Sequence, residues 1–517
     1  MFAPLAKTGE AFASSSSSSS SPPAAGAIHY YLPAAVLVFI GWLWHTFSLG
    51  SPVFPVDDAY ITLHNAQVLV SGNPDPNFAG TPALAGATSP LHLAVVSALI
   101  LIGLAPLWAL DTAAWLGTLL FALGMMRLCR AFAMPVWPAY FLCLAGLLCA
   151  RTPHQLMNGL ETSWALAGII WALALSAGEG KKCGIGMAAV CGTLPFLRPE
   201  LAALSLLLLP LPAWNRWKAT KDATETLRLL GLCCGSFVLA ALPWLAWQFA
   251  VSGSFVPATI AAKRYYFAEA GLPFDIKRSW VQGQFFAFLG ACGLLSLAGL
   301  FLFKTSQGKM GLLFTAVFLT VYYHQFPGAL GHYEGRYLYV LLPLLLFGAA
   351  SAFRQFAAHA VRLRWLTLFV LVAAVQSMLS APLIWREHQN GRAFTRVELA
   401  GVADWCRKNL PPGSRLLIHD AGYISYATDF PMADIVGLKT PANIPLHRDA
   451  TYASNGAARP LAIHAAALTS NAQYLVVLND WDGIFRITDG LRTYGWQVLP
   501  RRDKGAYRVY QLTPPRR

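Results

Sequence analysis

The sequence YYLPAAVLVFIGWLWHTFSL, residues 30–49, leads directly into GSPVFPVDDAYITLHNAQVLVSGNPDPNFAG, residues 50–80. The first of these segments has 20 residues and contains no Asp, Glu, Lys or Arg. A helix of about 20 apolar residues is long enough to cross the hydrocarbon core of a bilayer. The sequence therefore predicts a membrane-spanning helix followed by a polar loop with two adjacent carboxylates, Asp57 and Asp58.

The apolar pattern extends through most of the chain. Of the 517 residues, 56% are hydrophobic and only 12% are charged, whereas an ordinary soluble domain has roughly 25% charged residues. Eleven further apolar segments lie at approximately 90–104, 107–126, 135–150, 162–178, 183–197, 200–213, 229–251, 284–303, 310–327, 336–353 and 365–384. The pattern predicts a polytopic α-helical membrane protein with about 11–13 transmembrane helices.

The basic residues predict which side of the membrane each loop faces. The net charge is +14, but Lys and Arg are scattered over short loops and do not form the stripe that binds nucleic acid. Basic residues form small clusters in every second loop, and the loops between them are poor in Lys and Arg. The clusters are Arg127/Arg130, Lys181/Lys182, Arg216/Lys218/Lys221, Lys304/Lys309 and Arg354/Arg362/Arg364. These clusters are predicted to be cytoplasmic, so the C-terminal region is predicted to lie outside. Because twelve crossings would return it to the cytoplasm, one segment within 90–126 is predicted not to cross.

Composition divides the chain into three parts. Residues 1–29 contain the run Ser14 to Ser21 and are predicted to be a disordered cytoplasmic tail. Residues 30–385 form the predicted transmembrane domain, with a first outer loop at 50–89. Residues 386–517 have a mixed, polar composition and are predicted to be an extracytoplasmic α/β domain. Its predicted elements are a helix at 396–409 and strands at 415–420, 474–479, 496–499 and 507–512.

Three acidic residues at the predicted outer face are candidate catalytic groups. Asp57 and Asp58 are adjacent at a membrane boundary, where carboxylates are costly unless they pair, bind a cation or accept a proton. Glu161, in NGLETSW, begins another apolar segment on the same side. The alternative for all three residues is a structural one, because an acidic side chain in the first turn of a helix is stabilised by the helix dipole.

Several cations are also predicted at the outer face, against the usual charge bias. Lys263, Arg264 and Tyr265 lie in one outer loop, and His332 and Arg336 lie in another. An anionic ligand outside the cytoplasm would account for them, because Arg and Lys bind phosphate oxygens. Contact with anionic lipid headgroups is the alternative. The RPE run, with Arg198 and Glu200, predicts an ion pair between two short apolar segments.

Taken in order, several motifs resemble the GT-C superfamily of integral membrane glycosyltransferases. The resemblance is to the bacterial branch that includes mycobacterial arabinofuranosyltransferases and uses polyprenyl-phosphate sugars. The motifs are DDAYITLHNAQVLVSGN (57–73), ATSPLHL (87–93), NGLETSW (158–164), LRPE (197–200), VPATIAAK (256–263), GRYLYVLLP (335–343) and LLIHDAGYISYATDFPMADIVGL (416–438). Together they cover nearly all of the chain after residue 30.

The resemblance implies a function and a set of roles. The chain would be an inverting hexosyl- or pentosyltransferase that moves a sugar from a polyprenyl-phosphate donor to a glycan, lipid or protein acceptor of the cell envelope. Asp57 or Asp58 would be the general base, with Asp57 favoured, and Glu161 would assist. Donor phosphate would be bound by Lys263, Arg264, His332 and Arg336, supported by Arg198, Glu200, Tyr265 and Tyr337. The active site would face outward from the inner or plasma membrane, in contact with membrane lipids.

Two questions stay open at this point. The first is a metal: Asp57 and Asp58 could hold a Mg²⁺ or Mn²⁺ ion, but Arg and Lys alone can also stabilise a phosphate leaving group. A transporter or flippase for a lipid-linked or anionic substrate is the alternative function, because it would share the many helices and buried charges. The absence of paired half-sequences and the position of the charges in outer loops favour the transferase.

Overall fold

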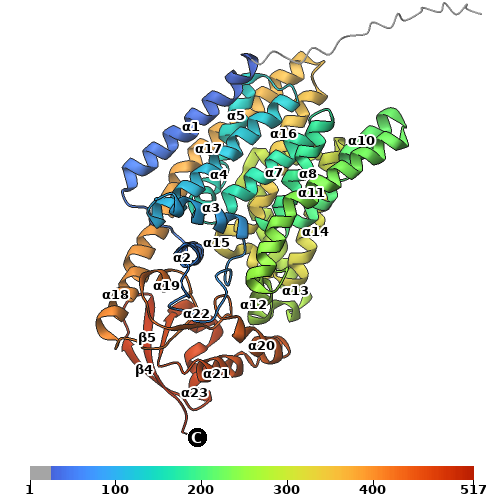
Figure 1. Cartoon of the computed structure of the whole chain (residues 1–517). Helices are drawn as coiled ribbons and strands as arrows, with labels where there is room; N and C mark the ends of the chain where they lie inside the picture. Colours follow the sequence, from blue (N-terminus) through green and yellow to red (C-terminus); the bar gives the residue numbers. More distant parts are fainter. Residues whose placement is uncertain (1–24, 517) are drawn as a thin grey trace, which may run out of the picture.

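The structure is a computed structural model that describes residues 25–516. Helices α1 to α17 form one bundle, and a small α/β domain is attached to the end of the bundle away from the start of α1 (Figure 1). The helices of the bundle are α1 (Ala25–Leu49), α2 (Asp58–Ser71), α3 (Pro90–Leu101), α4 (Pro106–Ala131), α5 (Val136–Leu148), α6 (Thr152–Met157), α7 (Thr162–Ser176), α8 (Lys181–Thr193), α9 (Leu201–Leu208), α10 (Leu211–Thr220), α11 (Ala223–Ser252), α12 (Ala258–Phe267), α13 (Phe274–Cys292), α14 (Ser306–Gln325), α15 (His332–Gly335), α16 (Leu342–Gln355) and α17 (Ala360–Phe394).

Each predicted apolar segment folds as helix, which confirms the polytopic helical fold. Among the described residues, six helical stretches are long and apolar enough to cross a membrane: Ile28–Ser48, Pro106–Ala131, Ala223–Ser252, Phe274–Lys304, Pro327–Gln355 and Ala360–Asn409. The apolar helices α3, α5 and α7 are shorter. The 12 residues of α3 span about 18 Å, less than the ~30 Å hydrocarbon core. This length suits the segment predicted not to cross.

The N-terminal end differs slightly from the prediction. Helix α1 begins at Ala25, five residues before the predicted start at Tyr30. The remainder of the predicted tail, residues 1–24, lies outside the described part of the chain. Helix α1 carries large apolar side chains that are exposed on the outside of the bundle, such as Phe39 and Phe47. A helix with such a surface is stable where lipid replaces water.

Close helix packing inside the bundle depends on small residues. Gly117 and Gly124 of α4 face α7. A Cβ atom at Gly117 would lie 2.4 Å from Ser163 Oγ, and a Cβ atom at Gly124 would lie 2.4 Å from Ile170 Cγ2. Both distances are too short for any residue larger than glycine. Because lipid provides little hydrophobic drive for helix association, close contact between small residues is what holds membrane helices together.

The C-terminal domain contains a five-stranded mixed sheet in the order β2-β1-β3-β5-β4. The strands are β1 (Leu416–Ile418), β2 (Met432–Asp434), β3 (Tyr474–Leu478), β4 (Gln497–Arg502) and β5 (Tyr507–Thr513). The helices are α18 (Ala400–Asn409), α19 (Tyr423–Ala427), α20 (Ile444–Leu446), α21 (Arg459–Thr469), α22 (Asn479–Phe485) and α23 (Ile487–Thr493). Strands β1, β2 and β3 run parallel, and β5 pairs antiparallel with β3 and β4. This arrangement confirms the predicted α/β class.

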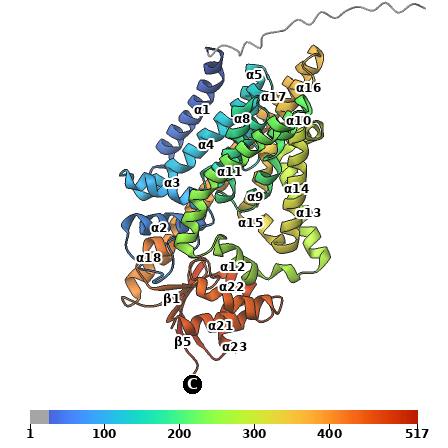
Figure 2. The same cartoon turned by 45° about the vertical axis from the view of Figure 1, so that its right-hand side comes forward.

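Two details of this domain were not predicted. Strand β2 has only three residues, too few for a sequence pattern to reveal it. The predicted boundary at residue 386 falls inside a continuous helical stretch, Ala360–Asn409, which joins the bundle to the soluble domain. Figure 2 shows α12 at the junction, directly next to the soluble domain.

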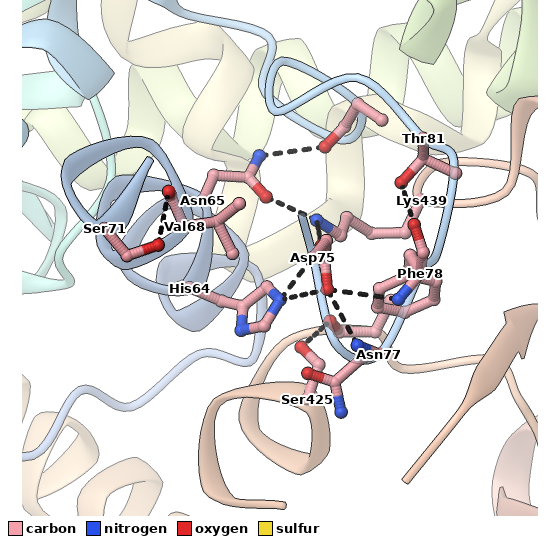
Figure 3. A network of polar contacts seen from close by, with 12 residues as sticks. His64, Asn65, Val68, Ser71, Asp75, Asn77, Phe78, Thr81, Ser425 and Lys439 are labelled. Atoms are coloured by element: carbon pink, nitrogen blue, oxygen red, sulfur yellow. Dashed lines mark hydrogen bonds and ion pairs between the residues drawn. The ribbon is translucent and has the colours of Figure 1, made fainter. Parts of the chain in front are cut away.

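Loop 50–89 lies between the bundle and the soluble domain and is fixed there by a buried polar network, drawn in Figure 3. Lys439 reaches from the soluble domain into the loop and is fully buried. Its Nζ lies 3.0 Å from Asp75 Oδ2, and His64 Nε2 lies 3.1 Å from the same carboxylate. Burial alone would raise the pKa of Asp75, but His64 and Lys439 hold it below its ordinary value. Asn77 adds hydrogen bonds to the carbonyls of Thr428 and Phe430.

We expect Lys439→Met to destabilise the protein by about 3 kcal/mol, because it removes one member of a buried ion pair and leaves Asp75 without its cation. The measurement is the thermal unfolding midpoint of the detergent-purified protein. Lys504→Met is the control, since Lys504 is exposed. Combining Lys439→Met with Asp75→Leu should recover part of the loss. An unfolding midpoint equal to that of the control would contradict this account of the junction.

Candidate active site

A cavity of about 350 Å³ lies where the bundle, loop 50–89 and the soluble domain meet. Its polar and aromatic lining residues are Asp57, Asp58, Thr88, Glu200, Thr259, Lys263, Phe267, Glu269, Tyr322, Phe326, His332, Tyr333, Tyr337, His419, Asp420 and Trp481. A recess of about 30 Å³ adjoins it and is lined by Glu161 and Arg336 as well as by Asp58 and Lys263. The fold thus gathers residues from seven separate sequence motifs around one space.

Asp57 and Asp58 have different surroundings because α2 begins between them. Asp57 precedes the helix and points to the soluble domain, where its Oδ2 accepts the Gly422 N–H at 2.8 Å and its Oδ1 accepts the Tyr423 N–H at 2.7 Å. Burial and the nearby Asp420 carboxylate raise the pKa of Asp57 well above its ordinary value, despite the two amides. Asp57 therefore joins the loop to the soluble domain.

Asp58 points instead toward the cationic side of the cavity. Its Oδ2 lies 3.3 Å from Arg336 Nη1, and its Oδ1 accepts the Tyr333 hydroxyl at 3.3 Å. Burial would raise the pKa of Asp58, but Lys263 and Arg336 outweigh it and leave the pKa below its ordinary value. Asp58 is accordingly ionised at neutral pH.

Tyr337 organises the cations next to Asp58. Two guanidinium groups lie close to its ring, with Arg198 Cζ 4.6 Å and Arg336 Cζ 4.8 Å from the ring centroid. Its hydroxyl lies 3.1 Å from Arg336 Nη2 and 3.4 Å from Lys263 Nζ. Three cations thus share one aromatic side chain on one wall of the site.

Two glutamates balance these cations. Arg198 Nε donates to Glu200 Oε1 at 2.7 Å, and Arg198 Nη1 lies 3.7 Å from Glu161 Oε1. The pKa of Glu161 is lowered, because Arg336 and Arg198 outweigh the effect of its burial. Both Nη atoms of Arg198 and the Nε of Arg336 are nevertheless buried without a hydrogen-bond partner among the described residues. Such donors are expected to meet a ligand or water.

Most of the candidate residues predicted from sequence come together here, but Arg264 and Tyr265 do not. Lys263 lines the cavity, whereas Arg264 Nη2 lies 3.1 Å from the Tyr452 hydroxyl and the Tyr265 ring lies 5.2 Å from the Tyr452 ring. Consecutive residues of a helix point in different directions, so α12 turns these two side chains toward the soluble domain. His332 lines the cavity next to Tyr333.

The soluble domain contributes three residues that are not among the site residues predicted from the sequence. His419 and Asp420 directly follow β1, and Trp481 lies in α22 just after β3. The rings of His419 and Trp481 are 4.8 Å apart, and the Tyr507 hydroxyl donates to Asp420. Ligands of α/β sheets commonly bind at the carboxyl ends of parallel strands. The signal was therefore the polar run HDAGY after the buried strand LLI.

A metal ion does not suit the pair Asp57 and Asp58 in this arrangement. Both oxygens of Asp57 accept backbone amides, while Asp58 pairs with Arg336. Among residues 25–516, no group of three or more His, Cys, Asp or Glu side chains is arranged to hold a metal ion. We therefore assign no catalytic step to a metal.

The fold of this chain, a helical bundle with an appended α/β domain, is similar to that of solved structures of two other proteins. ArnT from Cupriavidus metallidurans bound to undecaprenyl phosphate aligns with a TM-score of 0.55 and 14% identity over 95% of this chain and 98% of that chain. Its apo form aligns with the same TM-score and identity over 94% and 98%. AftD, an arabinofuranosyltransferase from Mycobacteria, aligns with a TM-score of 0.50 and 16% identity over 94% of this chain and 40% of that chain.

The expected resemblance to the GT-C superfamily and to a mycobacterial arabinofuranosyltransferase is thus confirmed for the fold. Residues 384–511 also match a family described as a domain of unknown function (DUF8728). No curated protein matches the sequence of this chain. The apolar helices that are long enough to cross a membrane make the described part of the chain a multi-pass membrane protein.

We expect Gly422→Ala to disturb the contact between Asp57 and the soluble domain. A Cβ atom at Gly422 would lie 2.0 Å from the Asp57 carbonyl oxygen and 2.6 Å from Oδ2, so the two segments would have to separate. Overpacking of this kind costs about 1–3 kcal/mol, which should lower the unfolding midpoint and speed proteolysis between bundle and soluble domain. Gly483→Ala is the control, because a Cβ there meets open space. Equal behaviour of the two variants would contradict the predicted contact.

Proposed function

We propose that this chain is an inverting glycosyltransferase that moves a sugar from a polyprenyl-phosphate donor to an acceptor outside the cytoplasm. One observation carries the proposal: Asp58 lies 3.3 Å from the buried Arg336, and Arg336 and the neighbouring Arg198 have hydrogen-bond donors without a partner among the described residues. Arg336 and the nearby Lys263 also lower the pKa of Asp58. Such a site can deprotonate a hydroxyl and stabilise a departing phosphate. ArnT, which shares the fold, binds undecaprenyl phosphate, and this supports a lipid-phosphate donor.

The cavity also suits the two chemically different ends of such a donor. Lys263, with Arg336 in the adjoining recess, would bind the phosphate oxygens. The lining also includes the apolar residues Val321, in α14, and Phe326, which directly follows α14. Val321 is exposed on the outside of the bundle, where membrane lipid would be. A polyprenyl tail could leave the cavity past these apolar residues.

Asp58 fits the role of general base better than Asp57, the residue favoured by the sequence. A base must be ionised in order to accept the proton of the acceptor hydroxyl. Both contacts of the Asp58 carboxylate are 3.3 Å long, whereas those of Asp57 are 2.7 and 2.8 Å, so the oxygens of Asp58 are held less tightly. Asp57 uses both oxygens for backbone amides, and its raised pKa favours the protonated form. Asp58 has a lowered pKa and faces the cations that would bind the leaving group. In this proposal, Asp57 positions the soluble domain.

The proposed reaction is a single displacement. Asp58 takes the proton of the acceptor hydroxyl, the acceptor oxygen attacks the anomeric carbon, and the bond from that carbon to the phosphate oxygen breaks. Polyprenyl phosphate leaves with the additional negative charge, which Arg336 and Lys263 stabilise. Attack from the side opposite the phosphate inverts the anomeric centre. Glu161 contributes by holding the cations Arg198 and Arg336 in place.

The soluble domain would provide the wall next to the reacting sugar or the acceptor. Trp481 offers an aromatic face of the kind that packs against apolar faces, and Asp420 and His419 offer hydrogen-bonding groups. We propose that the cavity opens at the extracytoplasmic face of the plasma membrane, since the predicted cytoplasmic clusters, such as Arg216/Lys218/Lys221 at the end of α10, lie at helix ends away from the soluble domain (Figure 1).

Asp58→Asn should reduce turnover by about 10²- to 10⁴-fold, the usual contribution of a general base, while donor binding is retained. The assay measures polyprenyl phosphate released by detergent-purified protein from a panel of polyprenyl-phosphate sugars with a mixed glycan acceptor. Asp57→Asn is the matched variant and should chiefly lower stability. If Asp57→Asn abolished turnover in folded protein while Asp58→Asn did not, the base would be Asp57. Failure of every donor to bind would exclude the transferase.

The pH profile provides a second, independent measure of the base. Because its pKa lies below the ordinary value of 3.8, Asp58 stays ionised well into acid solution. The acid limb of kcat/KM, which reports the base of the free enzyme, should therefore lie below pH ~4. With Asp57 as base, the raised pKa would move the limb to higher pH. An acid limb near neutrality would thus contradict the assignment of Asp58.

A further inference from the structure

A second cavity, of about 540 Å³, lies within the bundle among α1, α4, α5, α6 and α17. It has no lining residue in common with the candidate active site. The proposed transferase reaction uses none of its side chains. Its occupant is therefore a separate question.

The cavity has an apolar rim and a polar inner wall. The rim includes Leu37, Trp44 and Met378, which are 41%, 54% and 51% exposed on the outside of the bundle. The inner wall includes His154 and His388, which are 7% and 1% exposed. A ligand with an apolar tail and a polar end would match this division.

The two buried histidines lack partners. Nδ1 of His154 and Nδ1 of His388 have no hydrogen-bond partner among the described residues, although the rings lie only 5.3 Å apart. The indole Nε1 of Trp115, which also lines the cavity, has no partner either. Buried polar atoms are normally paired, so several unpaired ones around one space point to a missing hydrogen-bonding group.

The shape of the cavity follows the helix axes. His388 and Met378 lie ten residues apart on α17, and His45 and Leu37 lie eight residues apart on α1. At 1.5 Å per residue, these pairs span about 15 Å and 12 Å. The polar wall is at the end of the helices nearer the soluble domain, where α1 ends at Leu49. The long direction of the cavity therefore matches a lipid tail aligned with the helices.

We propose that this cavity binds a membrane amphiphile with an uncharged, hydroxyl-bearing head group, held by His154 and His388. The cavity is lined by no Asp, Glu, Lys or Arg side chain, so it offers no charge to neutralise a phosphate. An imidazole ring both donates and accepts hydrogen bonds, as a hydroxyl group does. The three histidines do not form a metal centre, because no described group is arranged to hold a metal ion.

The test uses two tritiated probes with a diazirine in the tail, a polyprenol and the corresponding polyprenyl phosphate, applied to the full-length protein in detergent. On irradiation, the polyprenol should label the peptide that contains residues 378–388, and unlabelled polyprenol should compete better than unlabelled phosphate. Ala381→Trp, which fills the cavity, should abolish this labelling. Leu379→Trp is the matched control, because Leu379 is 78% exposed and lies outside the cavity.

The combined variant His154→Phe and His388→Phe keeps the ring shapes and removes the hydrogen bonds. It should weaken polyprenol competition about threefold to tenfold, the range for loss of a neutral hydrogen bond, without changing the weak competition by the phosphate. Gel filtration establishes that each variant is folded. Labelling that survives Ala381→Trp, or equal competition by alcohol and phosphate, would overturn the proposal. Because Asp58→Asn leaves this cavity intact, it should leave the labelling unchanged whether or not the transferase assignment holds.

Discussion

The buried contact of loop 50–89 with the soluble domain is the constraint on which the site depends. Lys439 loses its hydration when it enters the loop, and Asp75 and Asn65 compensate for that loss through hydrogen bonds to its Nζ, while His64 binds the same Asp75 carboxylate. Removing one of these partners leaves a charge in a dry place, so the contact is either complete or strongly unfavourable. The loop that carries Asp57 and Asp58 is thereby held in one position. The active-site cavity is then enclosed by this loop together with the bundle and the soluble domain.

Within this frame, the start of α2 separates two adjacent carboxylates into different tasks. The residue before the helix points to the soluble domain, and the first helical residue points to the cations of the bundle. Asp57 then accepts amides 365 and 366 residues away in sequence, whereas Asp58 meets Arg336. A pair of acids that looks redundant in sequence becomes a positioning group and a proposed base.

The sequence predicted the apolar helices well because their signal is local and strong. It also predicted that Asp58, Glu161, Lys263 and Arg336 belong together, from their shared outer position and the resemblance of their motifs. The sequence could not predict which side chains of a helix face the cavity, nor which residues distant in sequence pack against it. Lys263 faces the cavity while its neighbour Arg264 does not, and only the orientation of α12 decides this. The contribution of His419, Asp420 and Trp481 depends on how the soluble domain docks, which no local pattern contains.

Arg336 gives the proposed mechanism its electrostatic logic. Before reaction it is paired with the ionised Asp58, whose carboxylate lies 3.3 Å away. As the acceptor proton reaches Asp58, that carboxylate loses its charge at the same time as the departing phosphate gains one. The guanidinium can then turn its attraction from the acid to the phosphate without an increase in the net charge of the cavity. In a buried site, uncompensated charge is costly. Because Arg336 is shared between the base and the leaving group, proton transfer to Asp58 frees the cation that stabilises the departing phosphate, so each event favours the other.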